Sequence, residues 1–106
     1  LNISDLTGIE AFTALTSLDC SQNQLSTLDL INNTSLTNMY CRGNQLTTLD
    51  VSKNTALRVL DCSQNQLSTL DLTKNIALTY LYCDNNKFDC DAIKAKYSDT
   101  EIFEEL

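Results

Sequence analysis

One register of residues recurs along this chain every 21 positions and constrains its fold more than any other feature. The pattern Leu-x-x-Leu-x-Cys-x-x-Asn begins at Leu15 and returns at Leu36, Leu57 and Leu78, with methionine replacing the second leucine in one copy. A strict period of about 20 to 30 residues with fixed leucines is typical of a solenoid, whose units bury their apolar edges only against their neighbours. We therefore expect a single domain spanning residues 1–106.

Each copy contains a short segment whose residues alternate in polarity. Repeat positions one, four and six are apolar (Leu57, Leu60 and Cys62 in one copy), while positions three and five vary. This alternation predicts a strand with one buried face, so each copy should add one strand to a parallel sheet. A second apolar set (Leu25, Leu28 and Leu30, with its equivalents) has a spacing of three and then two residues. That spacing favours an extended or 3₁₀ segment on the opposite wall of an α/β solenoid.

Two polar columns follow from the same register. Asparagines recur where each strand bends away, at Asn23, Asn44, Asn65 and Asn86. Stacked amides there can pair backbone groups that a tight turn leaves unsatisfied, which predicts a structural ladder. Aspartates recur at Asp29, Asp50 and Asp71. Three buried carboxylates about 4.8 Å apart would repel one another, so we expect them to face water or cap turns.

The two ends depart from the period. Residues 1–14 form a slightly longer, irregular first unit, whose inner wall is expected to contain Leu6, Ile9, Phe12 and Leu15. Residues 15–88 carry the regular repeats, and residues 89–106 are predicted to form a C-terminal cap. The chain opens at Leu1, partway into a repeat-like pattern, which predicts a fragment or a processed product.

A short helix is predicted at the start of the C-terminal cap. Asp89 can serve as its N-cap, Asp91 sits favourably in the first turn, and Ile93 and Tyr97 share a face. The helix should close the open end of the core and cover the last strand. Ile102, Phe103 and Leu106 could extend this lid, although the acidic residues around them are equally compatible with a frayed tail.

Four of the five cysteines fall in the repeat. Cys20, Cys41, Cys62 and Cys83 occupy inward position six and are predicted to stack as buried free thiols. Strand neighbours about 4.8 Å apart would be strained by a disulfide, and a linear column cannot surround zinc tetrahedrally, so an oxidised pair and a metal site are less favoured alternatives. Cys90 leaves the column and is expected to be a packed cap residue or an exposed thiol, so thiol reagents should label at most Cys90 in the folded protein.

Composition excludes several classes of function. The net charge is −7 and no basic stripe is visible, which argues against nucleic-acid binding. The chain has no histidine and no apparent nucleophile pair, so we predict no enzyme activity, and the motifs of metal and cofactor sites are missing. No stretch approaches the roughly 18 to 20 apolar residues that span a bilayer, so we predict no membrane insertion.

The variable positions leave one candidate surface. Positions three, five and seven of each copy should point outward from the sheet, and three of the four tyrosines fall there. Tyrosine is enriched at the energetic centres of protein interfaces. The predicted partner-binding residues are Tyr40, Tyr80, Tyr82, Asp19, Asp61, Asn38, Arg42 and Val59. The alternative is that tyrosine simply packs well on a sheet surface.

The repeat pattern resembles the leucine-rich repeat family, and in particular its bacterial internalin-like surface proteins. The segment Ile3-Ser4-Asp5-Leu6-Thr7-Gly8-Ile9-Glu10 reads like an opening repeat of that branch. The resemblance implies a right-handed superhelix with a curved parallel sheet on its concave side. It also implies an extracellular or cell-surface location and host adhesion.

We therefore predict a monomeric, non-enzymatic module that binds a protein partner through its concave sheet. Two alternatives stay open. A short solenoid can serve as a structural spacer or stalk that presents a neighbouring domain, since its small sheet limits the interface. Tyrosines beside carboxylates also suit a carbohydrate-binding repeat.

Overall fold

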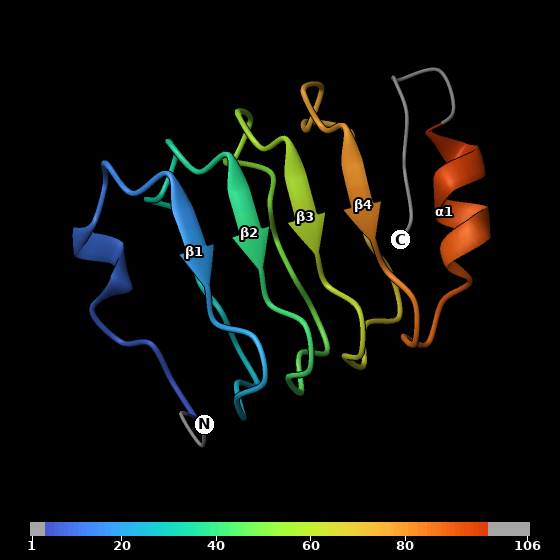
Figure 1. The fold of residues 1–106 in the computed structure, drawn as a ribbon, viewed down its shortest axis with the longest axis horizontal. Helices are drawn as coiled ribbons and strands as arrows, with labels where there is room; N and C mark the ends of the chain where they lie inside the picture. Colours follow the sequence, from blue (N-terminus) through green and yellow to red (C-terminus); the bar gives the residue numbers. More distant parts are fainter. Residues whose placement is uncertain (1–3, 98–106) are drawn as a thin grey trace.

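The computed structural model describes residues 4–97, and these form the stacked solenoid that the repeat predicts (Figure 1). Its strands are β1 (Ser17–Asp19), β2 (Asn38–Tyr40), β3 (Val59–Asp61) and β4 (Tyr80–Tyr82). They pair in parallel in the order β1-β2-β3-β4, one strand from each 21-residue copy. The predicted parallel sheet is confirmed.

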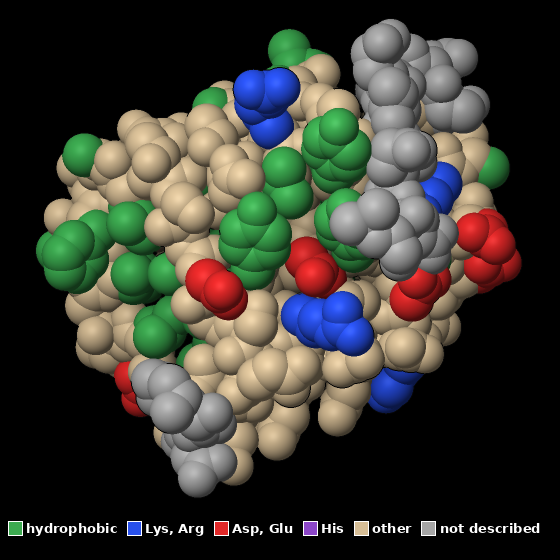
Figure 2. Space-filling view, in the orientation of Figure 1, with side chains coloured by type: hydrophobic (Ala, Val, Ile, Leu, Met, Phe, Trp, Pro, Cys, Tyr) green, Lys and Arg blue, Asp and Glu red, His purple; other side chains and the backbone are tan. Residues whose placement is uncertain are grey.

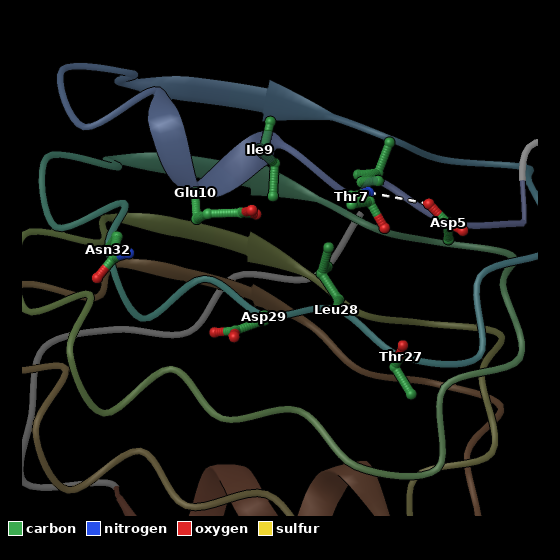
Figure 3. A pocket seen from close by; sticks show the side chains of 9 residues that line it. Asp5, Thr7, Ile9, Glu10, Thr27, Leu28, Asp29 and Asn32 are labelled. Carbon is green, nitrogen blue, oxygen red and sulfur yellow. Dashed lines mark hydrogen bonds between the residues drawn. The ribbon is translucent and has the colours of Figure 1, made fainter.

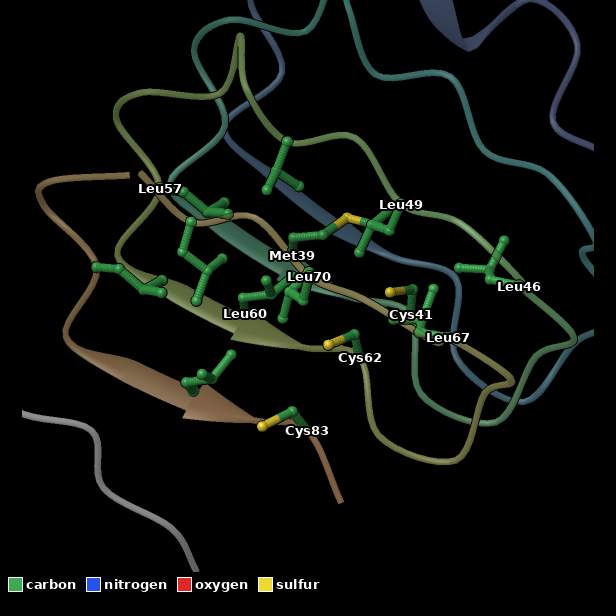
Figure 4. Close-up of a cluster of buried hydrophobic side chains, with 14 of the residues drawn as sticks. Met39, Cys41, Leu46, Leu49, Leu57, Leu60, Cys62, Leu67, Leu70 and Cys83 are labelled. Atoms are coloured by element: carbon green, nitrogen blue, oxygen red, sulfur yellow. The ribbon is translucent and has the colours of Figure 1, made fainter. Parts of the chain in front are cut away.

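The register of the sheet is set by the repeat itself. The central residues of adjacent strands are paired, as in Met39 with Leu60 and Leu60 with Leu81. These side chains point into the core, where they meet leucines from the opposite wall such as Leu49 and Leu70 (Figure 4). Since side chains alternate along a strand, the residues on either side of each central one face outward.

The wall opposite the sheet is built from turns rather than helices. Two consecutive turns recur in the copies that begin at Leu15, Leu36 and Leu57, closed by i to i+3 backbone bonds such as Asn54 N to Val51 O and Leu57 N to Asn54 O. Within residues 4–97, a 3₁₀ helix occurs only in the first unit, as η1 (Ile9–Ala11). The wall was predicted to contain extended or 3₁₀ segments. The regular copies have extended segments and turns there, and within the described residues the 3₁₀ helix occurs only in the irregular first unit.

The prediction for the inner wall of the first unit is confirmed for two of its four residues. Leu6 and Leu15 pack against the core, whereas Ile9 is only half-buried and Phe12 is 60% exposed. Phe12 occupies the repeat position that Asn33 holds one copy later, and its carbonyl accepts a hydrogen bond from the Asn33 side chain. That position serves backbone pairing between copies in the wall, and the phenyl group is left exposed.

The C-terminal cap begins as predicted. Helix α1 (Cys90–Lys96) follows Asp89, whose side chain accepts a hydrogen bond from the Asp91 N–H and so serves as N-cap. Tyr97 is buried, and its hydroxyl accepts a hydrogen bond from the Leu72 N–H, which joins the helix to the last turn of the solenoid. Ile102, Phe103 and Leu106 lie outside the described residues. No helix among residues 4–97 has the length and apolarity that crossing a membrane requires.

The cysteine column forms, but one of its members is not a free thiol. Cys41, Cys62 and Cys83 stack behind successive strands (Figure 4), and Cys20, Cys41 and Cys62 are free and buried. Cys83 is instead bonded to Cys90, across a Cα–Cα distance of 5.4 Å. The prediction of a free Cys83 is therefore wrong, whereas Cys90 is a packed cap residue, one of the two alternatives predicted for it. Bridging is unfavourable between column neighbours, but the last column member has the cap beside it rather than another strand.

The predicted asparagine ladder is confirmed and carries bonds between copies. The Asn65 side chain donates to the carbonyls of Cys41, one copy earlier, and of Cys62, in its own copy. Its Oδ1 accepts from the Leu46 N–H at 3.0 Å. Asn44 repeats this arrangement with Cys20, Cys41 and Leu25. Each copy is thereby hydrogen-bonded to the one before it on the side of the strand bends.

A second asparagine column lies in the turn wall, where the sequence pattern had suggested no role. Asn33, Asn54 and Asn75 are all buried. The amide of Asn54 donates to the carbonyls of Leu30 and Asn33, and that of Asn75 donates to Val51 and Asn54. In contrast to the first ladder, the Oδ1 atoms of this column have no hydrogen-bond partner. The predicted aspartate column lies nearby, exposed, with each carboxylate accepting the N–H two residues on.

Candidate functional site

A shallow hollow of about 450 Å³ lies on the outward face of the sheet. Six of the eight predicted partner-binding residues line it: Tyr40, Arg42, Val59, Asp61, Tyr80 and Tyr82. They come from β2, β3 and β4 and from the residue that lies two positions after β2. The period of 21 residues puts equivalent positions of adjacent copies side by side, so these residues meet although they are as much as 42 residues apart in the chain.

Asp61 lies at the centre of this hollow. The sheet register pairs it with Tyr40 on β2 and with Tyr82 on β4, so a tyrosine flanks it on each side at about one strand spacing, ~4.8 Å. Its Oδ1 accepts hydrogen bonds from the backbone N–H of Ser63, at 3.1 Å, and from the Ser63 hydroxyl. The carboxylate is therefore held in one orientation between two aromatic side chains.

Tyr40 is also held in place by its neighbours. Its hydroxyl accepts a hydrogen bond of 3.1 Å from the Asn38 side chain, and the Asn38 Oδ1 accepts one of 2.9 Å from the Thr37 hydroxyl. Asn38, a predicted binding residue, does not line the hollow. The structure places it instead where it orients a tyrosine that does.

Two charged residues of the predicted set are less constrained. Asp19 is exposed on β1 and lies outside the hollow, although its carboxylate accepts the Ser21 N–H in the same local turn that Asp61 uses. Arg42 lines the hollow and is exposed, with no ion pair to any residue in the 4–97 range. Asp61 and Arg42 are thus neighbours in the hollow without being paired to each other.

The surface of this face is mixed rather than purely apolar. Figure 2 views the molecule from the side on which the strands of Figure 1 lie in front, and hydrophobic side chains gather there beside acidic and basic ones. Such mixed surfaces with tyrosine are common in binding sites, because the ring buries area while its hydroxyl keeps a polar partner.

A second hollow, of about 400 Å³, lies between the first unit and the turn wall (Figure 3). It contains three carboxylates, but each accepts a local backbone N–H: Asp5 from Thr7, Glu10 from Gly8 and Asp29 from Ile31. The hydrogen bonds from Thr7 lower the pKa of Asp5. No cluster of residues suited to hold a metal ion occurs within residues 4–97. These carboxylates act as turn caps.

The free cysteines are unsuited to nucleophilic chemistry. Burial, with a smaller contribution from the charge of Asp19, raises the pKa of Cys20 from 9.0 to about 11. Burial likewise raises the pKa of Cys62 to about 12, with Asp61 as the second cause. A thiol that stays protonated at neutral pH is a poor nucleophile, so the column is structural.

One residue important to the site was missed by sequence reasoning. Ser63 was placed among outward positions, but it is buried and orients Asp61. The spacing Asp-x-Ser predicts this contact, because the N–H and hydroxyl of a serine two residues after an aspartate can both donate to the carboxylate of that aspartate. The same spacing at Asp19 and Ser21 gives only the backbone bond.

Comparison with known proteins gives a family match and two similar structures. Residues 34–74 match a model of leucine-rich repeats, two copies. The functional domain of InlJ from Listeria monocytogenes, which includes a cysteine ladder, is 49% identical over 80% of this chain, with a TM-score of 0.79. An internalin, InlF, from the same organism is 31% identical over 80%, with a TM-score of 0.78.

This chain spans only part of those proteins, covering 19% of the InlJ chain and 26% of the InlF chain. Among curated proteins, none matches the sequence.

Proposed function

Because this chain is a leucine-rich repeat protein that resembles the internalins of Listeria, we propose that it binds a protein partner through the outward face of its sheet. Leucine-rich repeat domains of this kind are non-enzymatic, and their usual role is protein binding. The proposed binding surface is the hollow lined by Tyr40, Arg42, Val59, Asp61, Tyr80 and Tyr82, which we call the tyrosine hollow.

The observation that carries the proposal is the convergence of three tyrosines on one hollow. Within residues 4–97 the remaining tyrosine, Tyr97, is buried in the cap, so the outward tyrosines are concentrated on a single face. Scaffold positions are fixed by the repeat, whereas outward positions are free to vary. Large aromatic residues at such positions add exposed area that folding itself does not require.

The size of the sheet limits what the surface can do alone. Four strands at about 4.8 Å make a sheet roughly 20 Å across, while a stable interface buries about 800 Å² on each partner. The tyrosine hollow is therefore proposed as the anchoring centre of a contact. Neighbouring residues such as Asn38 would form its rim.

We also propose that the domain works outside the cytoplasm, at the cell surface or as a secreted protein. The resemblance to internalins supports this location. The disulfide between Cys83 and Cys90 supports it independently, because disulfides persist mainly in oxidising compartments.

The test compares two triple variants of the domain. The tyrosine variant carries alanine in place of Tyr40, Tyr80 and Tyr82. The threonine variant is the control and carries alanine at three exposed positions of the turn wall, Thr27, Thr48 and Thr69. Both are immobilised beside the unaltered protein and exposed to extracts of candidate host-cell surfaces. We look for a protein that the unaltered chain and the threonine variant capture but the tyrosine variant does not. This protein is then purified, and calorimetry measures its affinity for all three forms of the domain.

We expect the tyrosine variant to lose at least tenfold in affinity, since each hot-spot side chain contributes about 1 to 2 kcal/mol or more. Circular dichroism checks that both variants keep the fold. Equal affinity for the tyrosine variant would refute the surface. The absence of any protein distinguished in this way would favour a spacer, and selective binding on a glycan array would favour a carbohydrate ligand.

A further inference from the structure

The tyrosine hollow combines aromatic side chains with one firmly held carboxylate, and this combination has a definite ligand chemistry. We propose that the hollow takes a basic side chain, arginine or lysine, of the protein partner, with Asp61 as its counter-ion. This inference rests on the proposed function only in assigning the cation to a protein.

The sheet register puts the carboxylate in the middle of the aromatic residues. Asp61 is paired with Tyr40 on one side and Tyr82 on the other, while Tyr80 is paired with Val59 in the adjacent row. The face of an aromatic ring attracts a cation within about 6 Å of its centre. A cationic group that approaches Asp61 between β2 and β4 thus meets a full negative charge with a tyrosine ring on each side of it.

The carboxylate is organised before any ligand arrives. Both of its described hydrogen bonds, from the Ser63 N–H and hydroxyl, end on Oδ1, and within residues 4–97 Oδ2 has none. One oxygen is therefore anchored and the other is available to accept from a guanidinium or ammonium group. Preorganisation matters because no free energy is spent on orienting the side chain during binding.

Arg42 also lines the hollow, which raises the question of an anionic ligand. Arg42 is exposed and follows β2 by two residues, whereas Asp61 is half-buried and central. No hydrogen bond to another residue of the 4–97 range fixes its guanidinium, and aromatic faces do not attract anions. The held charge, the central position and the rings all favour a cation at Asp61.

The charge of the whole chain acts in the same direction. With 14 acidic and 7 basic residues, the sequence carries a formal charge of −7. A field of this sign draws basic partners towards the surface and raises their association rate.

The experiment uses short peptides as probes, with the uncharged analogue of each base as control. Acetyl-Gly-Arg-Gly-amide and acetyl-Gly-Lys-Gly-amide are titrated into the labelled protein, and the chemical shifts of the tyrosine rings are followed by NMR. The controls are the same peptides with citrulline or acetyl-lysine, which keep the shape and lose the charge. We expect at least one basic probe to saturate the shifts of Tyr40 and Tyr82 with an affinity at least tenfold above its control.

Three substitutions then locate the charge. Asp61→Asn keeps the acceptor for Ser63 and removes the charge, and it should weaken the basic probe about tenfold, a loss of about 1.4 kcal/mol. Asp19→Asn is the matched control, because Asp19 has the same repeat position and the same local turn but lies outside the hollow. It should change the affinity by less than twofold. Arg42→Gln removes a positive charge from the hollow and should therefore raise the affinity for the basic probe.

The inference is overturned if no basic probe binds, if the uncharged analogues bind equally well, or if Asp19→Asn weakens binding as much as Asp61→Asn. Weaker binding of the basic probe after Arg42→Gln together with stronger binding after Asp61→Asn would also overturn the inference, because Asp61 would then not be the counter-ion. The proposed function fails separately. A basic probe that binds at Asp61 while the tyrosine variant still captures its protein would keep this inference and refute the capture surface.

Discussion

The two asparagine columns make a sharp prediction, because the same residue type is buried in both columns but its Oδ1 accepts a hydrogen bond in only one of them. Asn65 and Asn54 are 8% and 1% exposed, so burial alone predicts that Asn54→Ala is the more damaging substitution. The hydrogen bonds predict the reverse. Asn65 uses both ends of its amide, whereas the Oδ1 of Asn54 is buried without a partner.

The expected change in the free energy of unfolding depends on which backbone groups lose their last hydrogen-bond partner. Without the Asn65 side chain, the carbonyls of Cys41 and Cys62 still accept from Asn44 and Asn86, but the Leu46 N–H loses its acceptor. An orphaned buried donor costs about 1 to 3 kcal/mol, and the lost bonds to carbonyls about 0.5 to 1 kcal/mol each. We expect Asn65→Ala to lower the free energy of unfolding by about 3 kcal/mol.

Removal of the Asn54 side chain orphans no group in the same way. The carbonyls of Leu30 and Asn33 still accept backbone bonds, from Asn33 N and Leu36 N. Loss of two bonds is offset by removal of a carbonyl oxygen that was already unsatisfied, a relief of about 1 to 3 kcal/mol. Asn54→Ala should therefore change the free energy of unfolding by about 1 kcal/mol or less.

Urea unfolding, followed by circular dichroism with the slope of the transition compared between variants, measures both values. An unchanged slope shows that the midpoint shift reports stability rather than a change in the unfolding transition. If Asn54→Ala destabilises the chain as much as Asn65→Ala, the hydrogen-bond reasoning is wrong and the second column contributes a bond that the geometry does not contain.

Three further predictions concern the turns and the cysteines. Gln64 has a φ of 57°, in the left-handed region that favours glycine, so Gln64→Gly should raise the free energy of unfolding by about 0.5 kcal/mol; a loss of stability in the same urea assay would refute this. Replacing Cys83 and Cys90 together by alanine should cost about 2.5 kcal/mol, the chain-entropy value for a loop of about eight residues, and an unchanged midpoint would exclude the disulfide. Because burial raises the pKa of Cys20 from 9.0 to about 11 and that of Cys62 to about 12, their thiols ionise in the unfolded chain before they do so in the folded one. The contribution of these two thiols to stability is therefore constant below about pH 9 and is lost between about pH 9 and 12, and a Cys62→Ala variant should show a shallower fall when thermal unfolding is followed across that range.

The fold was predictable because the information for it is local and repeated. Each copy states the same alternation of inward and outward residues, and equal spacing forces equivalent positions into adjacent strands. The position of the ladder asparagines and the N-cap of α1 at Asp89 followed from chemistry that needs only a few neighbouring residues. Phe12 was misplaced because the first unit lies at an end, where a neighbouring copy no longer dictates which positions are filled.

The candidate site was only partly predictable from the sequence, because the repeat gives equivalent positions of different copies the same local pattern. The period identified the outward positions, and six of the eight residues it selected meet in the tyrosine hollow. It could not distinguish Asp61 from Asp19, because the two share a repeat position and a local turn. What separates them is the number of neighbouring strands. Asp61 has a tyrosine on each side, whereas Asp19 has a described strand on one side only.

By itself, then, the sequence determined the solenoid, the parallel register and the face on which tyrosines gather, because a strict period converts spacing along the chain into contact in space. Only the tertiary structure decided what happens where that period stops or where copies differ. It joined Cys83 to Cys90 because the last column member faces a cap instead of a strand. It placed Asp61 at the centre of the hollow, because the tyrosines on either side of it come from the two neighbouring strands and meet it only when the sheet has formed.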